Sequence, residues 1–142
     1  MGRLTRDQAV TRLLNGIQAD LHACGAIRDL LERQFHAALR HRGAELGELA
    51  GELMPQLDAM EQRRRQRVQL VRALHGLDAT MDDLLDGLAA PQRAATRADW
   101  ERLEALVRDC QQATTRNSGL MAEQYTVMQR VLHGEDQLYA PR

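Results

Sequence analysis

The residue types that most often carry catalysis or bind metals are few in this chain, and their spacing suits neither task. The five histidines include no pair four residues apart, and the two closest, His36 and His41, are separated by five. On a helix that spacing turns two side chains about 140° apart, so they cannot share one metal ion. Ser118 is the only serine, and nothing in the sequence suggests a general base beside it. We therefore interpret the histidines as solvated or packed side chains.

Two further groups of residues could bind a ligand, and neither has the required spacing. Asp82, Asp83 and Asp86 form an acidic patch, but a Ca²⁺ loop needs a different arrangement of oxygen ligands. The stretch GAELGELAG (43–51) places its glycines four apart, which is a helical spacing rather than that of a phosphate-binding loop. The sequence therefore predicts no enzyme, with no catalytic residues, no metal and no cofactor.

The arginine-rich stretch EQRRRQR (61–67) raises the possibility of nucleic-acid binding. Successive helical residues wrap around the axis, so these arginines do not share one face, and Asp58 and Glu61 dilute their charge. No aromatic residue lies among them to stack on bases, and the whole chain has a net charge of -1. We interpret the stretch as a solvated helix side and expect no nucleic-acid partner.

The composition is typical of a single all-helical domain. Aromatic residues make up 3% of the chain, and the 10 glycines and 3 prolines leave little material for strands and their turns. No run approaches the roughly 20 apolar residues of a membrane span, and MGRLTRDQAV (1–10) has no apolar signal core. We expect a cytoplasmic protein without stable membrane insertion. Cys24 and Cys110 lie in apolar helical stripes, and free thiols are favoured over a disulfide.

Periodicity predicts helices over about 5–40 and 44–75. Thr5 is a plausible N-cap of the first, with Gln8 at the capping-box position, and Gly43 follows its expected end. Pro55 lies inside the second helix, where the loss of one ladder hydrogen bond predicts a kink or a restart.

A short helix over about 79–88, capped by Asp78, and a last helix over 99–132, capped by Asp99, complete the prediction. Residues 133–142 are expected to form a flexible tail. The fold class is therefore all-α, as an elongated antiparallel helical bundle or coiled coil of three long helices plus a short connector helix, within one domain over 1–142.

The last helix has the most regular apolar row of the chain, yet two of its inward positions are polar. The row keeps four-three spacing and comprises Leu103, Val107, Cys110, Thr114, Asn117, Met121, Gln124, Met128 and Val131. Asn117 and Gln124 can be explained as amides that fix the register inside the bundle, because other alignments would leave them unpaired. Alternatively, this face is shared with a partner helix and cannot be uniformly apolar. Periodicity does not choose between these explanations.

The segment RNSGLMAEQYTVMQRVLHGEDQLY (116–139) resembles the C-terminal signature of the FlgN-like flagellar export chaperones. The likeness rests on Asn117 with the small and apolar residues after it, on Leu132, and on Leu138–Tyr139 after a polar break at 133–134. The stretch LDAMEQRRRQRVQLVRAL (57–74) and the tryptophan near the start of the last helix, Trp100, also agree with the family.

This resemblance implies a cytosolic chaperone of the flagellar type III export system. Its clients would be the hook–filament junction proteins of the FlgK and FlgL type, the first and third hook-associated proteins, whose C-terminal helical segments it would keep from premature assembly. The expected client-binding residues are Asn117, Leu120, Met121, Gln124, Val127, Met128 and Leu132. Leu138 and Tyr139 would dock on the cytosolic domain of the export gate.

Another class of protein shares every helical feature. A self-associating coiled-coil structural or adaptor protein would need no secretion client, although it would have no use for a terminal Leu138–Tyr139 pair. A homodimer is compatible with either class.

Overall fold

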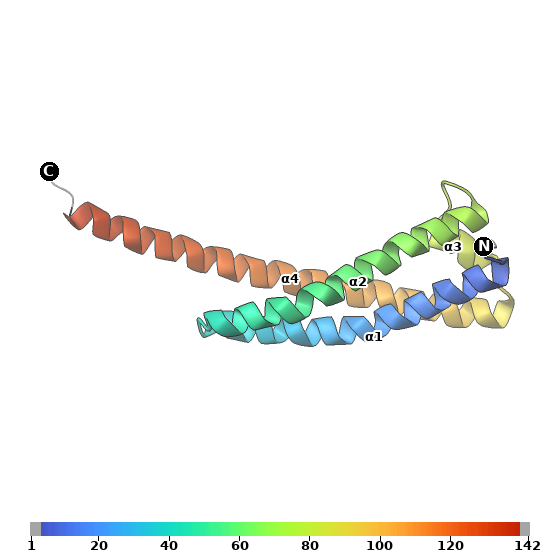
Figure 1. Ribbon diagram of the computed structural model, residues 1–142, viewed down its shortest axis with the longest axis horizontal. Coiled ribbons are helices and arrows are strands. Elements are labelled where there is room, and N and C mark those ends of the chain that lie inside the picture. The colour runs from blue at the N-terminus through green and yellow to red at the C-terminus, as the bar shows by residue number, and fades with distance from the viewer. Residues whose placement is uncertain (1–3, 140–142) are drawn as a thin grey trace.

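A computed structural model describes residues 4–139, with side chains described as far as residue 134. Its four helices are α1 (Arg6–Leu39), α2 (Gly43–His75), α3 (Met81–Asp86) and α4 (Ala90–Tyr139) (Figure 1). Three are long, α3 is a short connector, and the described residues contain no strand. The predicted all-α architecture is confirmed.

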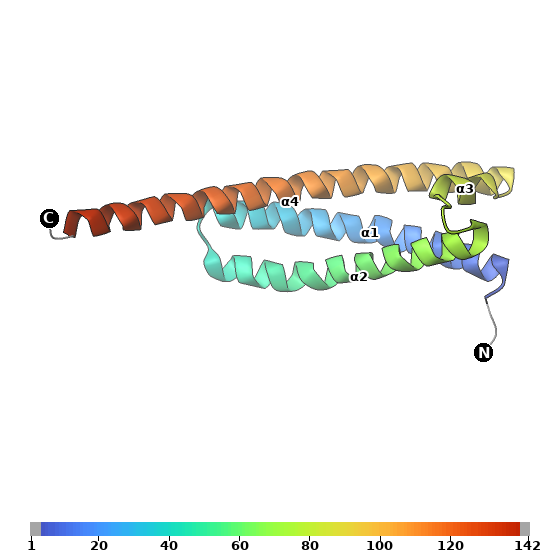
Figure 2. The ribbon, with the colours of Figure 1, turned by 90° about the horizontal axis from the view of Figure 1, so that it is seen from above.

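The first helix, α1, is the only element that packs along both other long helices. It lies between α2 and α4 (Figure 2), with α2 antiparallel to it and α4 parallel. Among the described residues, no Cα atom of α2 lies within 8 Å of one of α4. The bundle is therefore open on one side, where α2 and α4 make no close backbone contact.

Two capping boxes fix the starts of α1 and α3. The Thr5 hydroxyl accepts from the Gln8 amide at 3.1 Å and Gln8 Oε1 accepts from the Thr5 amide at 3.0 Å, as the sequence predicted. Thr80 and Asp83 form the same arrangement for α3. The predicted cap Asp78 is therefore replaced by Thr80, whose hydroxyl lies three residues before a carboxylate.

The last helix is longer than predicted at both ends. It begins at Ala90 rather than 99, because Pro91 lies in the first turn, where its missing N–H costs no helical hydrogen bond. It also continues through His133 and Gly134, and its backbone is helical to Tyr139. The predicted break at 133–134 is wrong, since one helical glycine lowers stability by only about 1 kcal/mol and does not end a long helix.

Turn residues also differ from the prediction between α1 and α2. His41 adopts the left-handed conformation with φ of 54°, while Gly43, the expected terminator, is the first residue of α2. Pro55 causes no restart, and α2 is one continuous helix with a gentle curve (Figure 1). Pro55 and Gly51 are both exposed, so water can hydrogen-bond the carbonyl that Pro55 leaves free.

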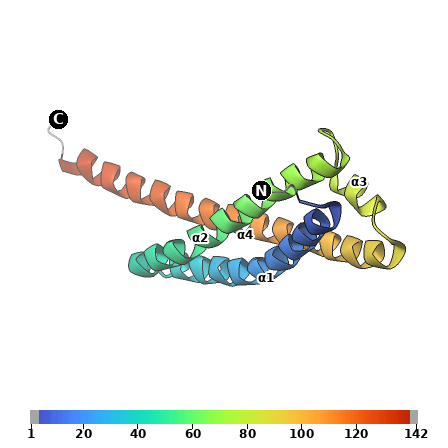
Figure 3. The same ribbon diagram turned by 45° about the vertical axis from the view of Figure 1, so that its right-hand side comes forward.

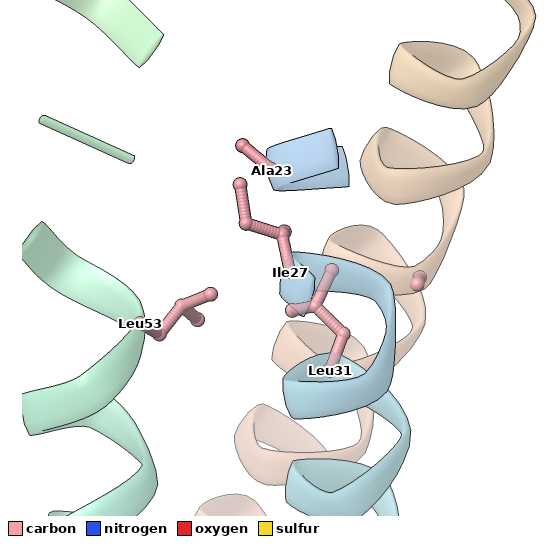
Figure 4. Close-up of a cluster of buried hydrophobic side chains, with 5 residues drawn as sticks. Ala23, Ile27, Leu31 and Leu53 are labelled. Carbon is pink, nitrogen blue, oxygen red and sulfur yellow. The ribbon is translucent and has the colours of Figure 1, made fainter. Parts of the chain in front are cut away.

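Small and branched apolar side chains form the core along α1. In one cluster, Ala23, Ile27 and Leu31 of α1 face Leu53 of α2 (Figure 4), and Ala113 of α4 completes it. Near the start of α1, Leu13, Val71 and Leu84 form a second cluster. The short helix α3 thus closes that end of the bundle.

A buried ion cluster joins α1 to α2. The carboxylate of Asp20, which is 1% exposed, accepts from Arg63 and from Arg67, one turn apart on α2. The Arg67 guanidinium lies over the Trp100 ring at 5.3 Å, so α4 also contacts the cluster. Burial lowers the pKa of Arg67 despite the opposing effect of Asp20. Arg64 and Arg65 pair instead with Glu61 on the exposed side, so only part of the arginine run is a solvated face.

We expect the substitution Asp20→Ala to lower the free energy of unfolding by about 3–5 kcal/mol, because it leaves buried Arg67 without its counter-ion. Glu61→Ala is the matched control: it removes exposed pairs to two arginines of the same run and should cost at most about 1 kcal/mol. Urea unfolding followed by circular dichroism measures both, and equal losses for the two variants would contradict the cluster's role.

Candidate functional site

Three side chains of α4 fix its register on α1. Cys110 Sγ donates to the Cys24 carbonyl at 3.8 Å, Asn117 Nδ2 to the Leu31 carbonyl at 2.8 Å, and Gln124 Nε2 to the Ala38 carbonyl at 2.8 Å. Donors and acceptors each recur every seven residues, and each pair is 86 residues apart in the sequence. A constant offset of this kind requires two parallel helices that follow the same heptad repeat.

The middle contact of this ladder is the most enclosed. Asn117 is 1% exposed, and its amide also donates to Gln34 Oε1 at 2.9 Å while its Oδ1 accepts from Arg116 Nε at 3.1 Å. Arg116 lies over the Phe35 ring at 3.9 Å and pairs with Glu32 at 3.0 Å. The amide group is thus satisfied entirely within the bundle.

This geometry places two predicted client-binding residues inside the α1–α4 contact. Asn117 and Gln124 both bond backbone carbonyls of α1, as the register explanation expects. A client that used these amides would have to displace α1 first. We therefore do not include them in the surface proposed below for a client.

Beyond this ladder, α4 continues without a covering helix. The same offset of 86 aligns Leu39, the last residue of α1, with Tyr125. Figure 3 shows α4 extending past the α1–α2 turn with no other element beside it. We call residues 125–134 the α4 free end. Its large apolar side chains are each at least 52% exposed, and they are Tyr125, Val127, Met128, Val131 and Leu132.

The remaining predicted site residues lie on either side of that segment. Leu120 and Met121 are half-buried, at the border where the bundle gives way to the free end. Leu138 and Tyr139 have helical backbones at the far end of α4, but their side chains lie outside the described residues. The structure thus groups Val127, Met128 and Leu132 on one exposed segment, which Leu120 and Met121 adjoin.

A second surface, which the sequence analysis did not predict, lies where α2 and α4 diverge. It is a hollow of about 690 Å³ with α1 as its floor, here called the α2–α4 groove. Its apolar lining comprises Cys24, Ile27, Leu57, Met60, Trp100, Leu103, Val107 and Cys110. The one available sequence signal was Trp100, a large aromatic at the start of the α4 row. An apolar groove between helices is suited to a helix rather than to a small polar substrate.

The cysteine, histidine and acidic side chains of the described residues bear on possible metal and thiol chemistry. Among them, no three His, Cys, Asp or Glu side chains could together hold a metal ion. Both cysteines are free thiols, and burial, with Cys110 and Asp20 nearby, raises the pKa of Cys24 to about 11. Within the same residues, no helix is long and apolar enough to cross a membrane.

Comparison with known proteins identifies a family. A family model described as FlgN protein matches residues 1–134, which is nearly the whole chain. No curated protein and no solved structure matches the sequence.

The buried position of Asn117 generates a prediction about folding. Asn117→Ala should lower the free energy of unfolding by about 2 kcal/mol, because the buried hydrogen bonds to Leu31 and Gln34 are lost. Thr114→Ala, an exposed position in the same row, is the control and should change it by less than about 0.5 kcal/mol. Denaturant titration tests this, and an Asn117 variant as stable as the control would show that the amide does not fix the register.

Proposed function

Because this chain belongs to the FlgN family, we propose that its α4 free end binds the C-terminal helical segments of hook–filament junction proteins. Members of this non-enzymatic family are flagellar export chaperones that bind hook-associated proteins. The finer proposal names the clients as the first and third hook-associated proteins and locates their binding surface. It also includes delivery of the bound client to the export gate from the cytoplasm.

The observation that carries this proposal is the position of the exposed apolar residues relative to α1. In the α4 row that faces α1, Asn117 and Gln124 are followed at the same seven-residue spacing by Val131. Val127 and Met128 flank Val131 on that side of the helix. The α4 free end therefore presents the face that α1 covers upstream, and a client helix would occupy the continuation of α1 beyond Leu39.

The size of this surface fits a chaperone that must release its client. Covering the exposed half of one large apolar side chain contributes about 1 kcal/mol, so the five together contribute about 5 kcal/mol before the cost of association. Further contacts with Leu120 and Met121 would extend the surface toward the bundle. Methionine adapts its shape to different partners, which is useful where one surface, here the α4 free end, serves two clients.

Delivery to the export gate is assigned to the end of α4. Leu138 and Tyr139 lie at the tip farthest from the α1–α2–α4 bundle (Figure 1), where an approaching gate domain would meet no other helix. An aromatic ring with a polar hydroxyl is a common anchor at small interfaces. The proposed client and gate contacts thus occupy successive parts of one helix.

The client-binding proposal predicts that Val131→Glu weakens client binding by about 100-fold, since a carboxylate would face the apolar stripe of the client helix. Stability should change little, because Val131 is exposed. Gln129→Glu, on the opposite side of the same turn, is the matched control and should bind normally. Calorimetric titration with a C-terminal fragment of a hook-associated protein measures both affinities, and equal affinities would remove the α4 free end from client binding.

The gate proposal predicts a separate effect of Tyr139→Ala. Client affinity should stay unchanged, while binding of the loaded chaperone to the purified cytosolic domain of the export gate should weaken by about tenfold. Gln137→Ala is a neighbouring control that removes no aromatic ring. If the two affinities of the Tyr139 variant are both unchanged, or fall together, Tyr139 has no separate role at the gate.

A further inference from the structure

A second row on α4 connects the α2–α4 groove with the α4 free end. With four-three spacing it comprises Trp100, Glu104, Val107, Gln111, Thr114, Ser118, Met121, Tyr125, Met128 and Leu132. Its first five members line the groove, and its last three are exposed on the free end. Both unpartnered surfaces therefore share one side of a single helix.

The composition of this row is symmetric about its centre at three of its five mirrored pairs, whereas Glu104 mirrors Met128 and Gln111 mirrors Met121. Apolar residues mark both ends, with Trp100 and Val107 on one side and Tyr125 and Leu132 on the other. The centre is small or polar, and Thr114, Ser118 and Gly119 are all exposed there. A methyl group added at Gly119 would meet no other atom within 4 Å. Small residues of this kind allow two helices to cross closely.

Such a row can pair with the same row of a second copy of the chain when the two α4 helices are antiparallel. A two-fold axis between Thr114 and Ser118 brings Trp100 opposite Leu132 of the partner. It also brings Val107 opposite Tyr125 of the partner, and the reverse contacts follow by symmetry. Trp100 and Val107 then each meet an apolar side chain, while Met128 and Met121 meet Glu104 and Gln111. A parallel pair in register would leave both grooves empty.

We propose that, without a client, two copies of this chain pair along this row in antiparallel orientation, and that each α4 free end occupies the α2–α4 groove of the other copy. The inference goes beyond the proposed function, because it requires no client. In this dimer the second copy covers both the α2–α4 groove and the α4 free end of the first.

The apolar half of the groove accepts the free end in this pairing. The groove extends along α4 from Trp100 to Thr115, which is about 24 Å of helix. The two-fold axis places residues 117–132 of the partner along this length, so that residues 125–132 of its free end face residues 100–107. Because α2 and α4 make no close backbone contact, an added helix can rest on both and complete a four-helix cross-section.

Groove residues on α2 extend the contact beyond the two α4 helices. Leu57 is exposed and Met60 half-buried, and both line the groove together with Val107. The partner's free end would cover them together with the α4 lining. A net charge of -1 per chain offers little repulsion between copies. Each contact occurs twice in the symmetric dimer, which doubles the apolar area buried.

The consequence for the chaperone is that its apolar surface is masked when no client is present. Met128 and Leu132 belong both to this row and to the surface proposed for the client. The second copy and the client would therefore compete for the same side chains. Self-pairing would protect the exposed apolar face from nonspecific aggregation until a client replaces it.

Disulfide trapping tests the pairing on the full-length chain without any client. A Val107→Cys chain mixed with a Tyr125→Cys chain should give crosslinked heterodimers under mild oxidation. Neither variant should crosslink with itself, because the two sites lie at opposite ends of the row. The unsubstituted chain, with Cys24 buried and Cys110 half-buried, is the background control. Crosslinking of each variant with itself, or none in the mixture, would overturn the antiparallel register.

Sedimentation equilibrium of the unmodified chain gives an independent measurement. The mass should rise from one to two chains with concentration, and Leu132→Glu should raise the dimer dissociation constant at least tenfold. Arg130→Glu introduces the same residue on the other side of α4 and should leave the dimer intact. A monomer at all concentrations up to about 100 µM, or equal effects of the two variants, would overturn the proposal. Because no client is present, these results do not depend on the proposed function.

Discussion

The register of α4 on α1 determines which surfaces of this protein are available. Parallel packing with an offset of 86 residues is fixed by buried Asn117, and Gln124 repeats the contact one heptad later. Since α1 ends at Leu39, no helix covers the described side chains of α4 from Tyr125 to residue 134. A slip of α4 by one heptad toward the start of α1 would bring the free end beside α1, and it would place Ile27 where Gln34 now accepts from Asn117. By fixing this register, Asn117 and Gln124 keep the apolar side chains of the α4 free end exposed.

The second constraint is that one helix supplies both long contacts. Asp20 joins α1 to α2 through Arg63 and Arg67, while the amide ladder joins α1 to α4. Both neighbours are held by α1, the helices α2 and α4 make no close backbone contact, and a groove remains between them. Buried ion pairs and amides add less stability than close apolar packing, but they are demanding about alignment. In this chain, alignment determines where the groove and the free end lie.

Periodicity predicted the fold class and the three long helices. The residue types Thr5 and Gln8 predicted the capping box, and the segment 116–139 carried the family resemblance. Periodicity could not predict which neighbour covers each face, and for that reason Asn117 was open to two explanations from the sequence. Asp20 looks like any surface aspartate until α2 places two arginines beside it. The last helix was expected to begin at Asp99 and to break at 133–134 from local residue preference, but α4 begins at Ala90 with Pro91 in its first turn and continues through Gly134. Trp100 was the only sequence signal for the α2–α4 groove, because the groove arises where α2 and α4 make no close backbone contact.

Sharing of Met128 and Leu132 between a client and a second copy would have a thermodynamic consequence. Only the monomeric fraction could bind, so the apparent client affinity would fall as that fraction falls. A weak segment of some unrelated protein would then fail to displace the second copy, whereas a long client helix that also contacts Val127 and Val131 would succeed. Discrimination would come from competition rather than from polar recognition. Such competition would let a surface with few hydrogen-bonding groups of its own select its partners.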